Sequence, residues 1–349
     1  MKRLLLGLLI GAGCLYWFLD NTDWQEMQRV LGEIRVAWVV LAVFILLMEF
    51  AIRAFRWKII LRSLTQQVTT MDLFRAQVIG ATANTILPLR LGEIVKPTIV
   101  CNRTGLPFIP VATTAIMERV YDLLGMVSVL VFMVLFLQPN LSPPPDQQIL
   151  IDNLQRYGGI FGLVAVLAMG IFFFLASQKE SMRPVFERIT SIAPIPIQRF
   201  FMRLFDGFVE GLGNSTDTKG IWQAGVLSVG MWLNGALAIY CLFQAFSLTL
   251  PFGAACFISV AIALAVAVPQ APGFVGVFHI VIFNTLLLWN QDANIAKGFA
   301  LIFWGVSFLP VTLVGLGFGI VEDIDWKSLN ALRSVDGPTQ QPSTRDLEQ

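Results

Sequence analysis

The longest stretch without a charged residue is the feature that most constrains this chain. No Asp, Glu, Lys or Arg occurs between Gly220 and Gln291. One transmembrane helix needs only about 20 apolar residues, so this stretch is long enough to cross a bilayer more than once. Proline and glycine interrupt helices, which predicts breaks at Pro251 and again from Pro269 to Gly276.

The rest of the chain has the same character. Its mean hydropathy is +0.71 and only 13% of its residues are charged, whereas about a quarter are charged in a soluble protein. Further apolar runs of membrane-spanning length lie at 36–52, 110–137, 158–176 and 299–320. We therefore expect an all-α polytopic membrane protein with a single transmembrane domain, 1–325, and a polar cytoplasmic tail, 326–349.

Several other classes of protein are not supported. The run 1–19 resembles a signal peptide, but it stays apolar past Cys14, so we interpret it as an uncleaved first helix, with cleavage as the alternative. The cysteines have no metal-ligand spacing. The net charge of +1 gives no hint of nucleic acid. We find no catalytic triad, metal cluster or phosphate-binding loop, and we predict no cofactor.

The basic residues predict the orientation. Lys2 and Arg3 place the N-terminus in the cytoplasm by the positive-inside rule, and Arg53, Arg56, Lys58 and Arg62 return the chain there after the second span. The segment 138–157 has one basic residue and is expected outside. The basic segment 178–219 is expected to form cytoplasmic amphipathic helices. Both termini are then cytoplasmic, in a multi-pass protein of the cytoplasmic (inner) membrane.

This orientation predicts two re-entrant hairpins. The segment 73–100 must leave on the side from which it came, with a bend at Pro88 to Gly92. In the second half, short apolar pieces at 252–268 and 274–289 flank a similar interruption and have the opposite orientation. We expect about six full transmembrane helices plus two re-entrant hairpins, with 36–137 and 221–320 as inverted repeats. Interrupted segments in matching places of two halves indicate a transporter with its site at the repeat interface.

Charged residues gather around the first interruption. Three cations and three acids, which could neutralise each other, are Arg90, Lys96 and Arg119 with Glu93, Glu118 and Asp122. Charges at membrane depth are costly unless paired, and they are usually functional. The apolar flanks, with Asn84 and Pro88 among them, suggest unwound backbone that lines a cavity. The alternative is a solvated cytoplasmic loop.

These residues also carry a family resemblance. The stretches "NTILPLRLGEIVKPTIVCNRTGLPF", "ATTAIMERVYDLLG" and "PQAPGFVGVFH" resemble the motifs of the lysylphosphatidylglycerol synthase transmembrane-region family, or flippase-like membrane proteins. The resemblance covers nearly the whole chain. It implies a polytopic fold that moves a lipid across the membrane or helps to modify one. By matching position, it assigns to the functional region Asn84, Arg90, Gly92, Glu93, Lys96, Glu118, Arg119 and Asp122, and the late motif supplies Pro272, Gly273, Gly276 and His279.

Two departures from the family pattern narrow the expected function. The chain ends soon after its last apolar run, so we expect neither a fused cytosolic transferase nor lysyl-lipid synthesis. The late motif commonly carries an acid where His279 stands. This lone histidine is more typical of a structural residue than of a proton or headgroup ligand.

We expect a translocase for a phospholipid or a lipid-linked headgroup. The alternatives are a membrane-embedded transferase or accessory subunit in glycolipid or cell-envelope lipid synthesis, and a membrane anchor for a cytosolic enzyme. The expected partners are a membrane lipid, a lipid-synthesis enzyme or glycosyltransferase, and a second copy of the chain.

Overall fold

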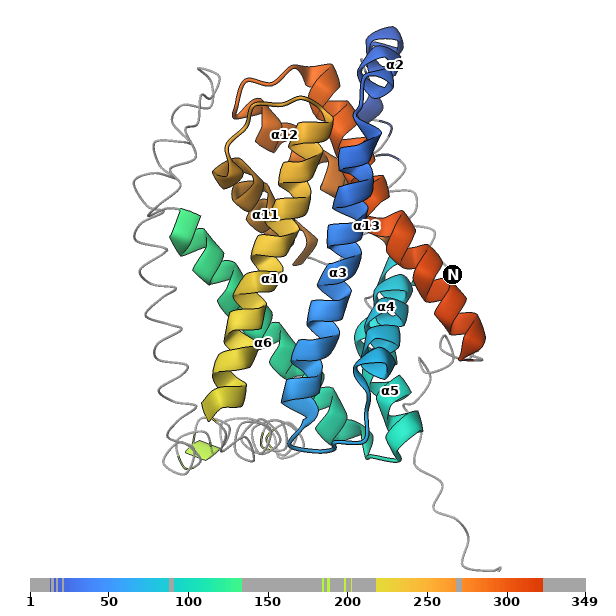
Figure 1. Ribbon diagram of the computed structural model, residues 1–349, viewed down its shortest axis with the longest axis vertical. Coiled ribbons are helices and arrows are strands. Elements are labelled where there is room, and N and C mark those ends of the chain that lie inside the picture. Colours follow the sequence, from blue (N-terminus) through green and yellow to red (C-terminus); the bar gives the residue numbers. More distant parts are fainter. Residues whose placement is uncertain are drawn as a thin grey trace, which may run out of the picture.

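The computed structural model describes residues 22–87, 91–133, 218–267 and 272–322, with a few single residues between 13 and 20 and between 184 and 202. All secondary structure in this part of the chain is helical (Figure 1). The helices are α2 (Trp24–Gly32), α3 (Val36–Leu61), α4 (Thr70–Ile86), α5 (Gly92–Thr104), α6 (Phe108–Phe132), α10 (Thr218–Ala245), α11 (Phe252–Ala267), the 3-10 helix η4 (Pro272–Phe274), α12 (Val277–Leu287) and α13 (Ala293–Val321).

In the first half of the chain, α4 and α5 form an antiparallel hairpin. Thr69 begins α4 with a capping box, in which its side chain accepts from the Asp72 N–H and Asp72 accepts from the Thr69 N–H. Gly105 ends α5 in the left-handed conformation, with φ 69°. Both helices lie in the lower half of the view in Figure 1, between the long helices α3 and α13.

The second half places its short helices at the other end of the molecule. After α10, which packs antiparallel along α3, the chain forms α11, η4 and α12 in the upper half of Figure 1, and α13 then descends past α4. Gly315 of α13 packs so closely on α4 that a Cβ there would overlap the Thr82 hydroxyl. Glycine at this position therefore permits the close approach of α13 and α4.

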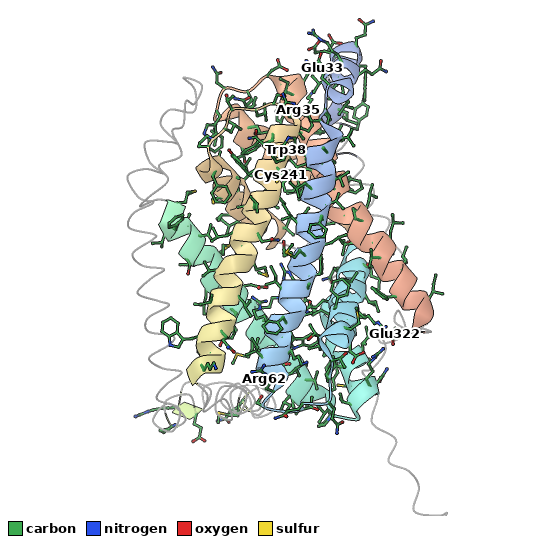
Figure 2. The ribbon with its side chains drawn as sticks, viewed as in Figure 1. Glu33, Arg35, Trp38, Arg62, Cys241 and Glu322 are labelled. Carbon is green, nitrogen blue, oxygen red and sulfur yellow. The ribbon has the colours of Figure 1, made fainter. Side chains whose placement is uncertain are left out.

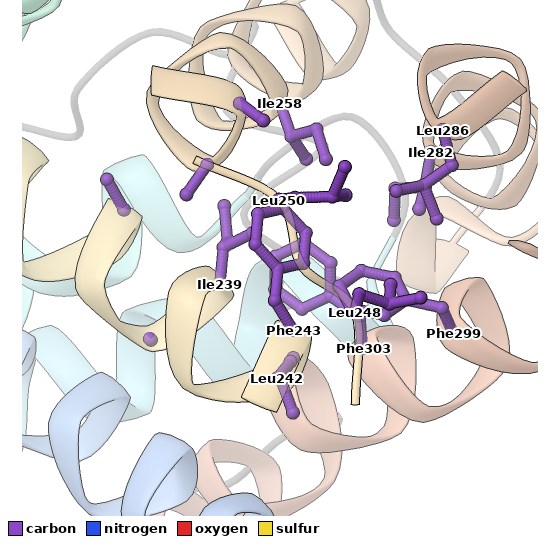
Figure 3. Packing of buried hydrophobic residues seen from close by; sticks show 14 of the residues in the cluster. Ile239, Leu242, Phe243, Leu248, Leu250, Ile258, Ile282, Leu286, Phe299 and Phe303 are labelled. Carbon is purple, nitrogen blue, oxygen red and sulfur yellow. The ribbon is translucent and has the colours of Figure 1, made fainter. Parts of the chain in front are cut away.

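Two apolar cores hold the described helices together. The upper one is built mainly from α10, α11, α12 and α13, and Figure 3 shows Phe243, Phe299 and Phe303 close together within it. The lower one joins α3 to the α4–α5 hairpin and α6. Large apolar side chains such as Phe44 on α3, Trp222 on α10 and Leu313 on α13 are exposed. An apolar core surrounded by an apolar outer surface is what a bilayer requires.

Three of the described helices are long and apolar enough to span a membrane: Val36–Leu61, Lys219–Ala245 and Ala293–Ile320. The span expected at 110–137 corresponds to α6, a helix of 25 residues that carries three charges near its middle. Most of the span expected at 1–19 lies outside the described residues, as do the span expected at 158–176, most of the segment 178–219 and the whole tail 326–349.

Asp23 caps the short helix α2 that precedes α3. Two details of the sequence prediction are wrong. The second span does not end at residue 52, because α3 continues to Leu61. Asn84 does not lie in unwound backbone, because it belongs to the last turn of α4. The predicted interruption itself is present, since α4 ends at Ile86 and α5 begins at Gly92.

Candidate functional site

Eight charged side chains from α3, α5 and α6 form connected ion pairs, and we call them the charge cluster. They are Glu49, Arg53 and Arg56 on α3, Glu93 and Lys96 on α5, and Glu118, Arg119 and Asp122 on α6. Four are acidic and four are basic, so their formal charges cancel. Buried charge is tolerated only when it is paired in this way.

The innermost pair joins α5 to α6. Lys96 Nζ lies 2.9 Å from Glu118 Oε2, with the two side chains only 4% and 2% exposed. Gln77 of α4 bridges them, since its amide nitrogen donates to Glu118 (2.7 Å) and its oxygen accepts from Lys96 (3.2 Å). The ammonium of Lys96 also lies 5.4 Å from the centre of the Trp57 ring. Apart from Glu93, which lies 3.9 Å from Lys96 Nζ on the same helix, these partners are supplied by other helices.

Arg56 connects α3 to the same acids and is completely buried. Its Nη2 lies 2.7 Å from Asp122 Oδ1 and 3.7 Å from Glu118 Oε1, while its Nη1 donates to Ser228 of α10 at 2.7 Å. Its Nε makes no hydrogen bond to any of the residues that the structure describes. A buried donor of this kind is normally satisfied by water or a ligand.

Arg53 lies one turn earlier on α3. It forms an ion pair with Glu49 (2.7 Å) in the i,i+4 arrangement of a helix and approaches Asp122 at 3.6 Å. Arg53 and Arg56 were expected to follow the second span. That placement is wrong, because both belong to α3 and face the acids of α6.

The outer edge of the cluster is more open. Glu93 Oε1 lies 2.6 Å from Arg119 Nη2, and the two side chains are 33% and 47% exposed. Arg119 also binds Asp122 at 2.9 Å. Large apolar side chains flank this edge on the same two helices, because Ile94 of α5 and Ile116 of α6 are exposed. The cluster therefore runs from a fully buried interior to a polar edge between apolar side chains.

Asn84 and Gly92 hold the start of α5 against α4. The Asn84 side chain accepts from the Gly92 N–H (2.8 Å) and donates to Glu93 (3.3 Å). It therefore satisfies one of the N–H groups that the first turn of a helix leaves free. A Cβ on Gly92 would overlap the carbonyl oxygen of Gly80, so only glycine permits this approach. The hydrogen bonds of Asn84 and the close contact of Gly92 together fix the direction of the Glu93 side chain.

The structure thus brings together many of the predicted site residues, namely Asn84, Gly92, Glu93, Lys96, Glu118, Arg119 and Asp122. Pro88 and Arg90 lie outside the described residues. Pro272, Gly273, Gly276 and His279 belong to η4 and the start of α12. In the described part of the chain, none of these four takes part in the ion pairs of the charge cluster.

The η4 segment nevertheless approaches the first hairpin. A Cβ on Gly273 would lie 3.8 Å from Trp304 and 3.9 Å from the Thr85 methyl group in the last turn of α4. Gly273 has φ 69°, which favours glycine, and its carbonyl accepts from the Trp304 indole (2.8 Å). His279 is 2% exposed, accepts from the Gly276 N–H and packs against Phe18. These contacts are typical of a structural histidine.

Sequence reasoning missed four polar members of the site: Glu49, Arg53, Arg56 and Gln77. The first three did give a signal, because spacings of four and three place them on one helix face. The positive-inside rule took precedence and ended the span at residue 52, before Arg53 and Arg56. Gln77 gave no signal, because one amide in an apolar run is common.

Metal binding has little support in the part of the chain that the structure describes. No group of three or more His, Cys, Asp or Glu side chains there could hold a metal ion. The two acids of α6, Glu118 and Asp122, form ion pairs with Lys96 and Arg56. Their charges are therefore already compensated.

Long apolar helices with a compensated charge cluster between them define a helical integral membrane protein with a polar interior site. The family model for the lysylphosphatidylglycerol synthase transmembrane region matches residues 4–315, and the chain belongs to this family.

Two curated relatives are similar to this chain. One is a UPF0104 membrane protein of Methanothermobacter thermautotrophicus, 23% identical over 84% of this chain and 87% of that protein. The other is Glycosyltransferase AglD of Haloferax volcanii, 27% identical over 47% of this chain and 24% of that protein. The second similarity thus covers about a quarter of a longer protein.

Proposed function

We propose that this chain is a flippase-like translocase that moves a phospholipid or a lipid-linked headgroup across the cytoplasmic membrane. The observation that carries the proposal is the buried, neutral charge cluster beside the interruption between α4 and α5. A headgroup that crosses a bilayer needs polar partners at membrane depth, and a protein keeps such partners there only if they neutralise each other. A purely structural interior would be more stable with apolar residues in their place.

The arrangement of the two halves supports this proposal. In our interpretation, α4–α5 and α11–η4–α12 are re-entrant hairpins from opposite faces of the membrane, within inverted repeats formed by α3–α6 and α10–α13. The contact between Gly273 and Thr85 brings the interruption of the second half next to the end of α4. Transporters built from such repeats bind their substrates where the interrupted segments meet.

We assign the headgroup phosphate to Arg90, which comes two residues before α5. Its planar guanidinium can bind two phosphate oxygens at once. The formal charges of the eight cluster residues cancel, and Arg90 adds one formal positive charge to the same part of the sequence. Glu93 and Arg119, at the exposed edge, are the residues that a headgroup would meet first.

The alternative is a membrane-embedded transferase or an accessory subunit in glycolipid or cell-envelope lipid synthesis. The similarity to part of Glycosyltransferase AglD favours it, and a lipid-synthesis enzyme or glycosyltransferase is the partner that it implies. The pairing of Glu118 and Asp122 with cations argues against these acids as metal ligands or general bases.

A reconstituted transport assay separates these functions. The purified chain is inserted into liposomes that contain a fluorescent phospholipid, and an impermeant quencher reports the lipid that changes leaflet. We expect transport by the unaltered chain and its loss in Arg90→Ala and Arg90→Lys, because lysine keeps the charge but not the two-point contact. Arg29→Ala, at an exposed position on α2, is the control. A well-folded Arg90→Ala with full transport would exclude the proposed headgroup role.

Lipid analysis of a deletion strain identifies the substrate. An anionic or sugar-linked lipid retained in the inner leaflet indicates transport. The disappearance of that lipid from both leaflets indicates a role in its synthesis.

A further inference from the structure

A second polar pocket lies at the lower end of α3, apart from the charge cluster. It has a volume of about 410 Å³ and lies between the last turn of α3, the following turn and the start of α4. Its lining residues are Lys58, Leu61, Arg62, Thr65, Gln66, Val68 and Leu73. Leu61, Val68 and Leu73 are buried and form an apolar base. The other four bring polar or charged groups to the pocket.

The charges of this pocket distinguish it from the rest of the molecule. On α3 to α6 the other basic side chains all form ion pairs with carboxylates, namely Arg53, Arg56, Arg75, Lys96, Arg103 and Arg119. Lys58 and Arg62 form none with any described residue. They lie one helical turn apart, on the same face of α3. None of the described residues that line the pocket is acidic, so the formal charge of this lining is +2.

The neutral polar groups complete a set of hydrogen-bond donors. Thr65 Oγ1 accepts from the Gln67 N–H at 3.1 Å, which leaves its hydroxyl hydrogen free to donate. The Gln66 amide supplies two further N–H groups. Two cations with a hydroxyl and an amide, above an apolar base, match a phosphate group that carries an apolar substituent.

We propose that this pocket binds a phosphate group, as found in the headgroup of an anionic phospholipid or in inorganic phosphate. The position favours the lipid as its source. Arg62 lies at the lower end of α3 (Figure 2), directly after the candidate span Val36–Leu61. The end of a span is where we expect the lipid headgroups. Basic pockets at the ends of membrane helices are typical sites for anionic lipid headgroups. This proposal does not depend on transport, because none of its residues belongs to the charge cluster.

The test uses the full chain purified in a neutral detergent. Native mass spectrometry counts bound lipids, and thermal unfolding measures stabilisation, with phosphatidylglycerol, phosphatidylcholine or inorganic phosphate added in turn. The variants are Lys58→Gln/Arg62→Gln and Gln66→Glu. The second adds a negative charge at an exposed turn position, where folding tolerates substitution. Arg35→Gln removes a cation from the opposite end of α3 and is the matched control (Figure 2).

We expect the unaltered chain and Arg35→Gln to bind one phosphatidylglycerol more than the double variant does. We expect the affinity of that lipid to fall about tenfold or more in both pocket variants, because charged hydrogen bonds are lost or opposed. Arg90→Ala should keep this lipid, which separates the pocket from the proposed transport site.

Stabilisation by inorganic phosphate to the same extent would confirm the phosphate site and assign it to a soluble anion. Equal lipid counts and equal affinities in all variants would overturn the proposal. Equal binding of phosphatidylcholine would also overturn it, because the site would then not select negative charge.

Discussion

Lys96 of α5 and Glu118 of α6 form an ion pair of 2.9 Å, although each side chain is almost entirely removed from solvent. Gln77 of α4 contacts both of them, and Arg56 of α3 lies 3.7 Å from the same carboxylate. Side chains of four helices, α3, α4, α5 and α6, thus meet at a single buried ion pair. The pair holds the α4–α5 hairpin in place beside the proposed headgroup path.

Removal of one partner of this pair should be costly. We expect Glu118→Gln to lower the free energy of unfolding by about 3–5 kcal/mol, because Lys96 then stays buried without its closest carboxylate. The remaining carboxylate, that of Glu93, is 3.9 Å away. The double variant Lys96→Gln/Glu118→Gln should recover part of this loss. Denaturant unfolding in detergent measures both variants. Small and additive effects would mean that water reaches the pair.

The pair at the outer edge should behave differently. Glu93 and Arg119 are 33% and 47% exposed, so water screens their interaction. We expect Glu93→Gln to change the free energy of unfolding by less than about 1 kcal/mol and yet to reduce lipid transport. Unfolding and liposome transport are measured on the same preparation. Unchanged transport would remove Glu93 from the proposed path.

The close approach of α4 and α5 requires glycine. We expect Gly92→Ala to destabilise the chain by about 1–3 kcal/mol, because the added methyl group must displace the Gly80 carbonyl of the neighbouring helix. Gly230→Ala is the matched control, since a Cβ at that position in α10 meets no atom within 4 Å. Thermal unfolding of the two variants gives the comparison. Equal stability of both would show that the two helices separate easily.

Low pH should weaken the ion pairs that Glu322, at the end of α13 (Figure 2), forms with two arginines. These are Arg103 of α5 and Arg75 of α4. The hydrogen bond from Arg103 holds the pKa of Glu322 below its ordinary value of 4.5. A carboxyl group whose pKa is lower in the folded than in the unfolded state stabilises the fold. This stabilisation is complete above the pKa of the unfolded state and is lost as the pH falls through the pKa of the folded state.

Glu322→Gln should therefore reduce stability near neutral pH and weaken its decline below about pH 4.5. Thermal unfolding midpoints, measured from about pH 3 to about pH 7, report the stability near neutral pH and its decline in acid. Glu33→Gln is the control, because that side chain is 71% exposed and pairs only within its own helix. An identical acid dependence in both variants would contradict the role of Glu322.

The orientation of the chain is tested with single cysteines in a cysteine-free background. Cysteines at Asp146 and Asp152 should react with an impermeant reagent from outside, since the sparsely basic segment 138–157 is expected there. A cysteine at Gln66 should react only from the cytoplasm. Labelling of the first two positions only from the cytoplasm would reverse the proposed topology.

The sequence by itself determined the class of protein and the rough positions of its interruptions. Runs without charge leave no alternative to a membrane interior, and proline with glycine marks where a helix cannot continue. The end of α4 at Ile86, the start of α5 at Gly92 and the break around Gly273 therefore followed from local chemistry.

Only the tertiary structure decided how the charges are paired. Arg53 and Arg56 look like cytoplasmic flanking residues in the sequence, because the positive-inside rule counts charges without regard to the helix face on which they lie. Packing of α3 against α6 turns both arginines toward Asp122 and leaves Lys58 and Arg62, a few residues later, in a separate pocket. The four basic residues have similar local sequence, and their environments differ because other helices surround each one differently.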